Sequence, residues 1–232
     1  METLVRAIGA LAGVMFVLAV VALVLAIVAI VRGPKPETKI PLNLHMPALA
    51  ITFAPLSDIK GFLGPRDSPM RKQIRKGLNG DYVFIAMYWA LFVGMSVLLA
   101  GRSHRWAVLA GVVAAVCATG AAIFDVVENL RTAALVDTID IQQLQVSKVA
   151  FAGFGKWFLI SLSTIVLSLV FVRRDWLVLL AALYLLIGVT GLYGLLLRQP
   201  RCVELSFGLN LIGLPVVAFV FSFFPQKILE HL

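Results

Sequence analysis

Charged residues are scarce in this sequence, where Asp, Glu, Lys and Arg together make up 14% of 232 residues. Soluble globular domains carry about 25% charged residues and about 45–50% apolar ones. Here the hydrophobic fraction is 61% and the mean hydropathy is +0.98. These values exclude a soluble enzyme, a disordered chain and a disulfide-stapled secreted domain. They predict a multi-pass integral membrane protein.

Cysteine and histidine are also rare. The two cysteines, Cys117 and Cys202, have no partner at a spacing typical of metal ligands, and the three histidines are scattered over loops and the tail. We therefore expect neither a disulfide nor a metal site, and no motif indicates a cofactor. Aromatic or glycine-rich nucleic-acid motifs are absent. The net charge of +8 is therefore attributed to the positive-inside bias of membrane proteins rather than to a nucleic-acid partner.

Six apolar segments are long enough to cross a bilayer, which takes about 20 helical residues. These segments are Ala7–Val31, Tyr82–Ala100, Trp106–Phe124, Phe151–Val172, Trp176–Leu197 and Val203–Phe224. The first is longer than the apolar part of a signal peptide and no small-residue cleavage site follows it, which predicts an uncleaved anchor. The predicted fold is an all-α bundle of six transmembrane helices. It divides into an anchor helix (1–32), a basic, partly amphipathic membrane-surface loop (33–81) and a five-helix bundle (82–232).

Lysine and arginine are distributed unequally between the two sides of this predicted bundle. Most of them fall in residues 32–81, 125–150 and 198–202, which share one side. Because basic loops stay in the cytoplasm, we expect that side to be cytoplasmic and both termini to lie outside. A prokaryotic cytoplasmic membrane is the expected location.

The loop between the first two predicted spans changes character along its length. Apolar residues alternate with polar ones from Leu42 to Met46, and Leu49, Ile51 and Phe53 continue the period of two, which predicts one short strand or an extended segment interrupted at Pro47. Helical spacing over residues 56–63, ended by Gly64, predicts a short amphipathic helix on the membrane surface. A basic patch follows, and we expect it to contact anionic lipid or an acidic partner. The patch consists of Arg66, Arg71, Lys72, Arg75 and Lys76.

Small residues and one proline indicate how the predicted spans pack. Alanine and glycine recur through the third span, and Gly188, Gly191 and Gly194 step along the fifth. Small residues let helices approach closely in lipid, so these faces are predicted to be helix contacts. Pro215, preceded by Asn210, predicts a kink toward the interior of the bundle that can shape a cavity.

Polar residues gather at one end of the predicted bundle. Asp125, Glu128 and Asn129 have i, i+3 and i+4 spacing and therefore share one helix face. Lys156 follows in the next, antiparallel span. Because ionisable groups in a membrane face the interior and pair, we predict one cytoplasm-facing polar cluster. Its members are Asp81, Asp125, Glu128, Asn129, Lys156 and Glu204.

The sequence leaves several functions open. The leading hypothesis is a non-catalytic accessory or assembly subunit of a larger membrane complex, or a homo-oligomer. It rests on the lack of a catalytic motif, the small-residue faces, and an apolar segment at 42–63 that needs a surface. Two alternatives give the polar cluster a function. It belongs either to a proton- or ion-coupled transporter of a small solute, or to a lipid-modifying enzyme in which neighbouring carboxyl groups raise one another's pKa and provide a general acid. A purely structural network of ion pairs is the remaining reading of the cluster.

Overall fold

The structure is a computed structural model that describes residues 40–100, 105–171 and 178–223, with scattered positions between residues 10 and 24. Within these ranges all regular structure is helical. The elements are the 3-10 helix η1 (Pro41–Asn43) and the α-helices α2 (Pro47–Phe53), α3 (Leu56–Leu63), α4 (Pro69–Ala100), α5 (Arg105–Asp137), α6 (Gln143–Phe171), α7 (Val178–Leu196) and α8 (Pro200–Phe223).

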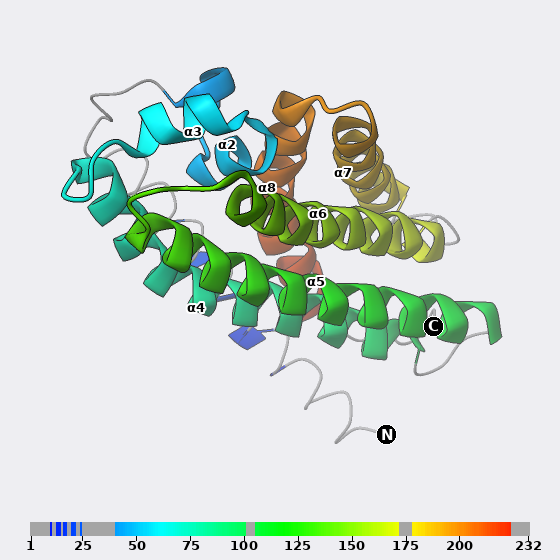
Figure 1. The fold of residues 1–232 in the computed structure, drawn as a ribbon. Coiled ribbons are helices and arrows are strands. Elements are labelled where there is room, and N and C mark those ends of the chain that lie inside the picture. Colours follow the sequence, from blue (N-terminus) through cyan, green and yellow to red (C-terminus); the bar gives the residue numbers. More distant parts are fainter. Residues whose placement is uncertain are drawn as a thin grey trace.

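The five long helices form a bundle in which each helix packs against the next one along the chain. Figure 1 shows α4 and α5 side by side, with α6 next to α5 and α7 and α8 beyond it. In the described residues, four segments are long and apolar enough to cross a membrane: Pro69–Ser96, Arg105–Asp137, Gln143–Phe171 and Val178–Leu196. Large apolar side chains on their outer faces are exposed, as lipid contact requires; Val116, Leu169 and Leu179 are examples.

The prediction of an all-α membrane bundle is confirmed at this level, whereas the count of six spans is not. The first predicted span, 7–31, lies largely outside the described residues. The last corresponds to α8, which contains Pro215 and is not among the four candidate spans.

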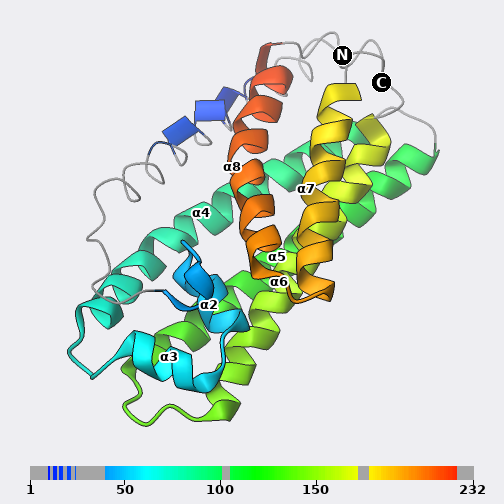
Figure 2. The same cartoon turned by 90° about the horizontal axis from the view of Figure 1, so that it is seen from above.

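Three of the long helices exceed the length that a bilayer needs. At 1.5 Å per residue, the 33 residues of α5 extend about 50 Å, against about 30 Å of hydrocarbon. Figure 2 shows that α2 and α3 lie at the same end of α4, α5 and α6. A separate hydrophobic core joins the elements there, and Ile59, Leu63, Leu135 and Val149 are fully buried in it. We refer to these parts (residues 40–80 and 132–150) as the α2–α3 end.

The prediction of an extended segment over residues 42–53 is wrong, because residues 47–53 form α2. Pro47 occupies the first turn of this helix, where a missing N–H costs nothing. Leu49, Ala50 and Ile51 are all completely buried, since α2 packs against both α6 and α8. A helix that is buried on several sides lacks the polar face that would reveal helical spacing. Its large apolar residues can then fall at every second position, as they do in a strand.

The predicted helix over residues 56–63 is confirmed, with Gly64 at a positive φ of 63° closing it. Its apolar residues Ile59, Phe62 and Leu63 are buried against the protein. This face therefore packs on the chain's own bundle and is not free to lie on a membrane surface.

The basic patch is split between internal contacts and solvent. It belongs largely to the first turns of α4, which begins thirteen residues before the predicted span. Arg71 is buried and donates hydrogen bonds to the carbonyl oxygens of Val136 (2.5 Å) and Thr138 (2.7 Å). It thereby satisfies carbonyl groups at the C-terminal end of α5. Arg75 forms an ion pair with Asp137. Arg66, Lys72 and Lys76 are exposed and remain available for lipid.

The glycines of α7 lie where neighbouring helices come closest. A Cβ added at Gly188 would lie 2.7 Å from the carbonyl oxygen of Ser161, and one at Gly194 would lie 2.8 Å from the backbone nitrogen of Val203. Both distances are shorter than real contacts allow. Glycine at these positions therefore lets α7 approach α6 and α8, as the packing interpretation predicts.

Candidate functional site

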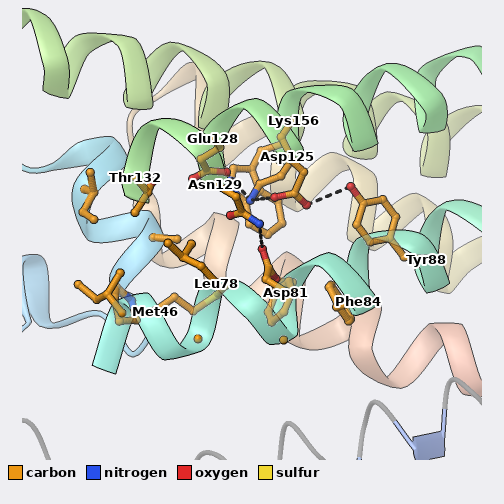
Figure 3. Close-up of a pocket in the computed structure, with 18 of the residues that line it drawn as sticks. Met46, Leu78, Asp81, Phe84, Tyr88, Asp125, Glu128, Asn129, Thr132 and Lys156 are labelled. Carbon is orange, nitrogen blue, oxygen red and sulfur yellow. Dashed lines mark hydrogen bonds and ion pairs between the residues drawn. The ribbon is translucent and has the colours of Figure 1, made fainter. Parts of the chain in front are cut away.

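A cavity of about 710 Å³ opens where α2, α4, α5, α6 and α8 meet. Apolar side chains form most of its walls, among them Ile51, Phe84, Phe92, Ile160 and Phe207. Polar side chains from α4, α5 and α6 gather on one wall, as Figure 3 shows. The cavity therefore has one polar end and an apolar body.

Lys156 lies at the centre of the polar wall. Its Nζ is 2.9 Å from Asp125 Oδ1 and 2.5 Å from Glu128 Oε2. All three side chains are at most 8% exposed. Nζ also lies 4.9 Å from the centroid of the Trp157 ring, within the range of a cation–π interaction. One ammonium group is thus shared between two buried carboxylates.

Helix α4 supplies a second set of contacts to this group. The Tyr88 hydroxyl donates to Asp125 Oδ2 at 3.0 Å, and Asn129 Nδ2 donates to Asp81 Oδ2 at 2.8 Å. Figure 3 shows Asp81 reaching Asn129 and Tyr88 reaching Asp125. The polar wall therefore carries three carboxyl groups, from Asp81, Asp125 and Glu128, beside a single buried ammonium.

Gly153 makes room for Glu128. A Cβ at this position of α6 would lie 3.1 Å from Glu128 Oε1 and 2.5 Å from Thr52 Oγ1 of α2. Glycine therefore lets α2, α5 and α6 close around the carboxylate without displacing it.

Three polar atoms of residues that line the cavity have neither a hydrogen bond nor an ion pair within the described part of the chain. They are Glu128 Oε1, Trp157 Nε1 and Asn210 Oδ1. Their residues are only 1%, 4% and 7% exposed. Buried polar groups are nearly always hydrogen-bonded in folded proteins. The residues that line the cavity therefore include two unpaired acceptors and one unpaired donor.

The structure brings together five of the six residues of the predicted polar cluster: Asp81, Asp125, Glu128, Asn129 and Lys156. Glu204 lies elsewhere. Its carboxylate accepts hydrogen bonds from the backbone N–H groups of His45 (2.6 Å) and Met46 (2.9 Å). Glu204 therefore fastens the start of α2 to α8. The sequence analysis placed Glu204 at the same end of the bundle as the other five residues. In the structure, the rotation of α8 about its axis directs the Glu204 side chain to α2 and away from the cluster.

Sequence reasoning missed two members of the site and gave another a different role. Tyr88 follows Asp81 by seven residues and so shares its face of α4, a spacing that could have been noticed. Trp157 directly follows Lys156, yet nothing in the sequence distinguishes it from a core aromatic residue. Asn210 was noted only beside the proline kink.

The described residues contain no group of three or more His, Cys, Asp or Glu side chains that could hold a metal ion. The ammonium of Lys156 already occupies the position between the Asp125 and Glu128 carboxylates. Comparison of the chain with protein-family models, with characterised proteins and with solved structures finds no significant match.

Proposed function

We propose that this chain is a lipid-modifying membrane enzyme, which binds an amphiphilic molecule in the cavity and supplies the general acid or base for a covalent reaction at its polar head. One observation carries the proposal. The buried carboxylate of Glu128, a residue of the cavity lining, is paired with Lys156 through one oxygen, while its other oxygen has no hydrogen-bond partner in the described chain.

The position of the polar wall along the helices supports an amphiphile. From Arg105 to Asp125, α5 runs about 30 Å at 1.5 Å per residue, which equals the thickness of the hydrocarbon layer. The last turns of α5, from Thr132 to Asp137, belong to the α2–α3 end. The polar wall thus lies at the depth where lipid head groups meet the hydrocarbon.

The group has the parts that proton transfer needs. A general acid or base must lie within hydrogen-bond reach of the reacting atom, and Glu128 Oε1 is the carboxylate oxygen free to do so. Lys156 pairs with Glu128 and balances its charge, and Asp125 holds Lys156 in position. In this proposal Glu128 exchanges the proton, and Lys156 and Asp125 are positioning residues.

The structure supports the accessory-subunit and transporter hypotheses less well than it supports the enzyme hypothesis. The accessory-subunit hypothesis rested on residues 42–63 needing a partner surface, but α2 and α3 cover their apolar residues on this chain's own bundle. A proton- or ion-coupled transporter would use the same carboxyl groups. Transporter sites, however, lie near the middle of the membrane, whereas Asp125 and Glu128 lie in the C-terminal half of α5 and Lys156 lies at the middle of α6.

The experiment compares lipid turnover by the full-length protein and by Glu128→Gln. Both are reconstituted in vesicles of the polar lipids extracted from membranes that contain the protein, and the lipids are followed by mass spectrometry. We expect one lipid species to be consumed by the unaltered protein and at least about 100-fold more slowly by Glu128→Gln, since loss of a general acid or base costs 10²–10⁴-fold.

The matched control is Asp140→Asn, which removes a carboxylate whose side chain is 87% exposed and outside the cavity. This variant should keep full turnover. Identical lipid profiles for the unaltered protein and Glu128→Gln would rule out lipid modification. A pH-dependent solute flux with unchanged lipids would instead favour the transporter.

A further inference from the structure

The charges of the side chains that line the cavity favour amphiphiles with one sign of head-group charge over the other. At its buried end, the carboxyl groups of Asp81, Asp125 and Glu128 outnumber the one ammonium of Lys156. The other cation of the described lining, Lys76, is exposed at the mouth. A negatively charged head would be repelled at the buried end, whereas a positively charged head would balance the surplus of carboxylates.

The unpaired polar atoms of the lining residues favour ligands that carry particular hydrogen-bonding groups. Two of the three, Glu128 Oε1 and Asn210 Oδ1, are acceptors and require donors. A phosphate or sulfate head offers mainly acceptors, and a quaternary ammonium has no N–H at all. A protonated primary or secondary amine supplies two or three N–H donors together with its charge. The single unpaired donor, Trp157 Nε1, needs one further acceptor, such as a hydroxyl or carbonyl oxygen near the amine.

The remaining walls are suited to an apolar body and to a cation beside aromatic rings. Phe84, Phe92 and Phe207 line the cavity together with Tyr88 and Trp157. Aromatic faces attract ammonium groups, and Lys156 already uses the ring of Trp157 in this way. The volume of about 710 Å³ accommodates a ligand of drug size or one lipid chain with its head.

We infer that the ligand of this cavity is an amphiphilic amine, whose protonated primary or secondary amino group donates hydrogen bonds to Glu128 and Asn210 while its hydrocarbon part lies against the phenylalanines. This inference rests on the proposed function and names its substrate class. The amine belongs either to a membrane lipid with an amino head group or to a lipophilic amine taken up from solution.

The test varies the head group at constant chain length. Native mass spectrometry of the full-length protein in mild detergent measures binding of dodecylamine, dodecyltrimethylammonium and dodecyl phosphate, all below their micelle concentrations. We expect dodecylamine to bind about tenfold or more tightly than the other two, which is the value of one charge-assisted hydrogen bond. Glu128→Gln should remove most of that preference. Binding in nanodiscs of phosphatidylethanolamine, compared with phosphatidylcholine, then identifies a lipid source.

Substitutions at two glycines form a matched pair that tests whether the ligand binds in the cavity. A Cβ at Gly80, in the cavity lining, and one at Gly208, outside it, would each meet nothing within 4 Å. A Cβ therefore fits at both positions, and Gly80→Leu adds a large side chain to the cavity lining. We expect Gly80→Leu to weaken dodecylamine binding at least about tenfold and Gly208→Leu to leave it unchanged.

The outcomes separate the two proposals. Equal binding of all three dodecyl compounds, weakened equally by Gly80→Leu, would overturn the amine assignment and leave an amphiphile-binding cavity. Tighter binding of dodecyl phosphate would overturn it as well. Binding that Gly80→Leu does not affect would show that the cavity is not the site, and the proposed function would then fail too.

Discussion

A buried ion pair is costly to break from one side only. Lys156→Met would leave Asp125 and Glu128 as neighbouring buried carboxylates without their shared cation. Removing one partner of a buried pair typically costs about 3–5 kcal/mol. We therefore expect Lys156→Met to unfold at much lower denaturant concentration than the unaltered protein in the same detergent, as followed by circular dichroism.

An exposed pair in the same protein supplies the comparison. Arg75 and Asp137 form an ion pair with side chains 61% and 48% exposed, and surface pairs contribute about 0–1 kcal/mol. Arg75→Ala should therefore change stability by no more than about 1 kcal/mol. Equal losses in the two variants would mean that the Lys156 group is not buried as described.

The positions of individual site residues could be predicted where their spacing along the sequence determines which face of a helix they share. The i, i+3, i+4 pattern put Asp125, Glu128 and Asn129 on one face of a helix, and an antiparallel neighbour brought Lys156 to them. Glu204 was not predictable in this way. Its contact with the start of α2 depends on the rotation of α8 and on a helix that the sequence pattern concealed.

Among the elements, α7 depends on glycine for its contacts with α6 and α8. Gly188→Ala would bring a methyl group within 2.7 Å of the Ser161 carbonyl oxygen and closer still to Ile165. Such overpacking typically costs about 1–3 kcal/mol. We expect Gly188→Ala to lower the midpoint of thermal unfolding in detergent, because α7 would be pushed away from α6.

The matched control for this prediction is Gly208→Ala in α8. A Cβ there meets nothing within 4 Å, and alanine is favoured over glycine in a helix by up to about 1 kcal/mol. The midpoint should therefore stay the same or rise. A decrease of similar size in both variants would show that helix propensity or backbone entropy, and not the α6–α7 contact, explains the effect.

Elements were predictable where one face of a helix meets protein and the other meets lipid or water. The predicted span at 82–100 lies within α4, but α4 begins at Pro69, because Arg71 finds carbonyl groups of α5 to bind. The helix at 47–53 was missed for the opposite reason: it is enclosed on several sides. Burial by distant helices is a tertiary effect that overrides local pattern.

On the scale of the whole molecule, the bundle combines a membrane part with an α2–α3 end built on extended helices. The first hydrophobic core, around Phe92, Leu167 and Tyr184, belongs to the membrane part. The second, around Ile59 and Leu135, belongs to the α2–α3 end. The polar wall lies between the two cores, where an amphiphile in the bilayer can present its head.

This division into a membrane part and an α2–α3 end predicts that two side chains of nearly equal exposure in the structure differ in their contact with water. Ile139, beyond α5, is 69% exposed, and Val116, within α5, is 66% exposed. In a membrane only Ile139 should face water. With Cys117 and Cys202 replaced by alanine, Ile139→Cys should react with a membrane-impermeant maleimide, and Val116→Cys should react only after detergent solubilisation and denaturation.

The same variants report the orientation that the distribution of Lys and Arg predicts. If the α2–α3 end faces the cytoplasm, Ile139→Cys will be labelled in inverted vesicles and protected in right-side-out vesicles. Labelling in right-side-out vesicles alone would reverse the orientation and place the cavity mouth at the outer surface. Rapid labelling of Val116→Cys in intact membranes would be more serious, since it would put the middle of α5 in water. The depth argument that places the polar wall among lipid head groups would then be lost.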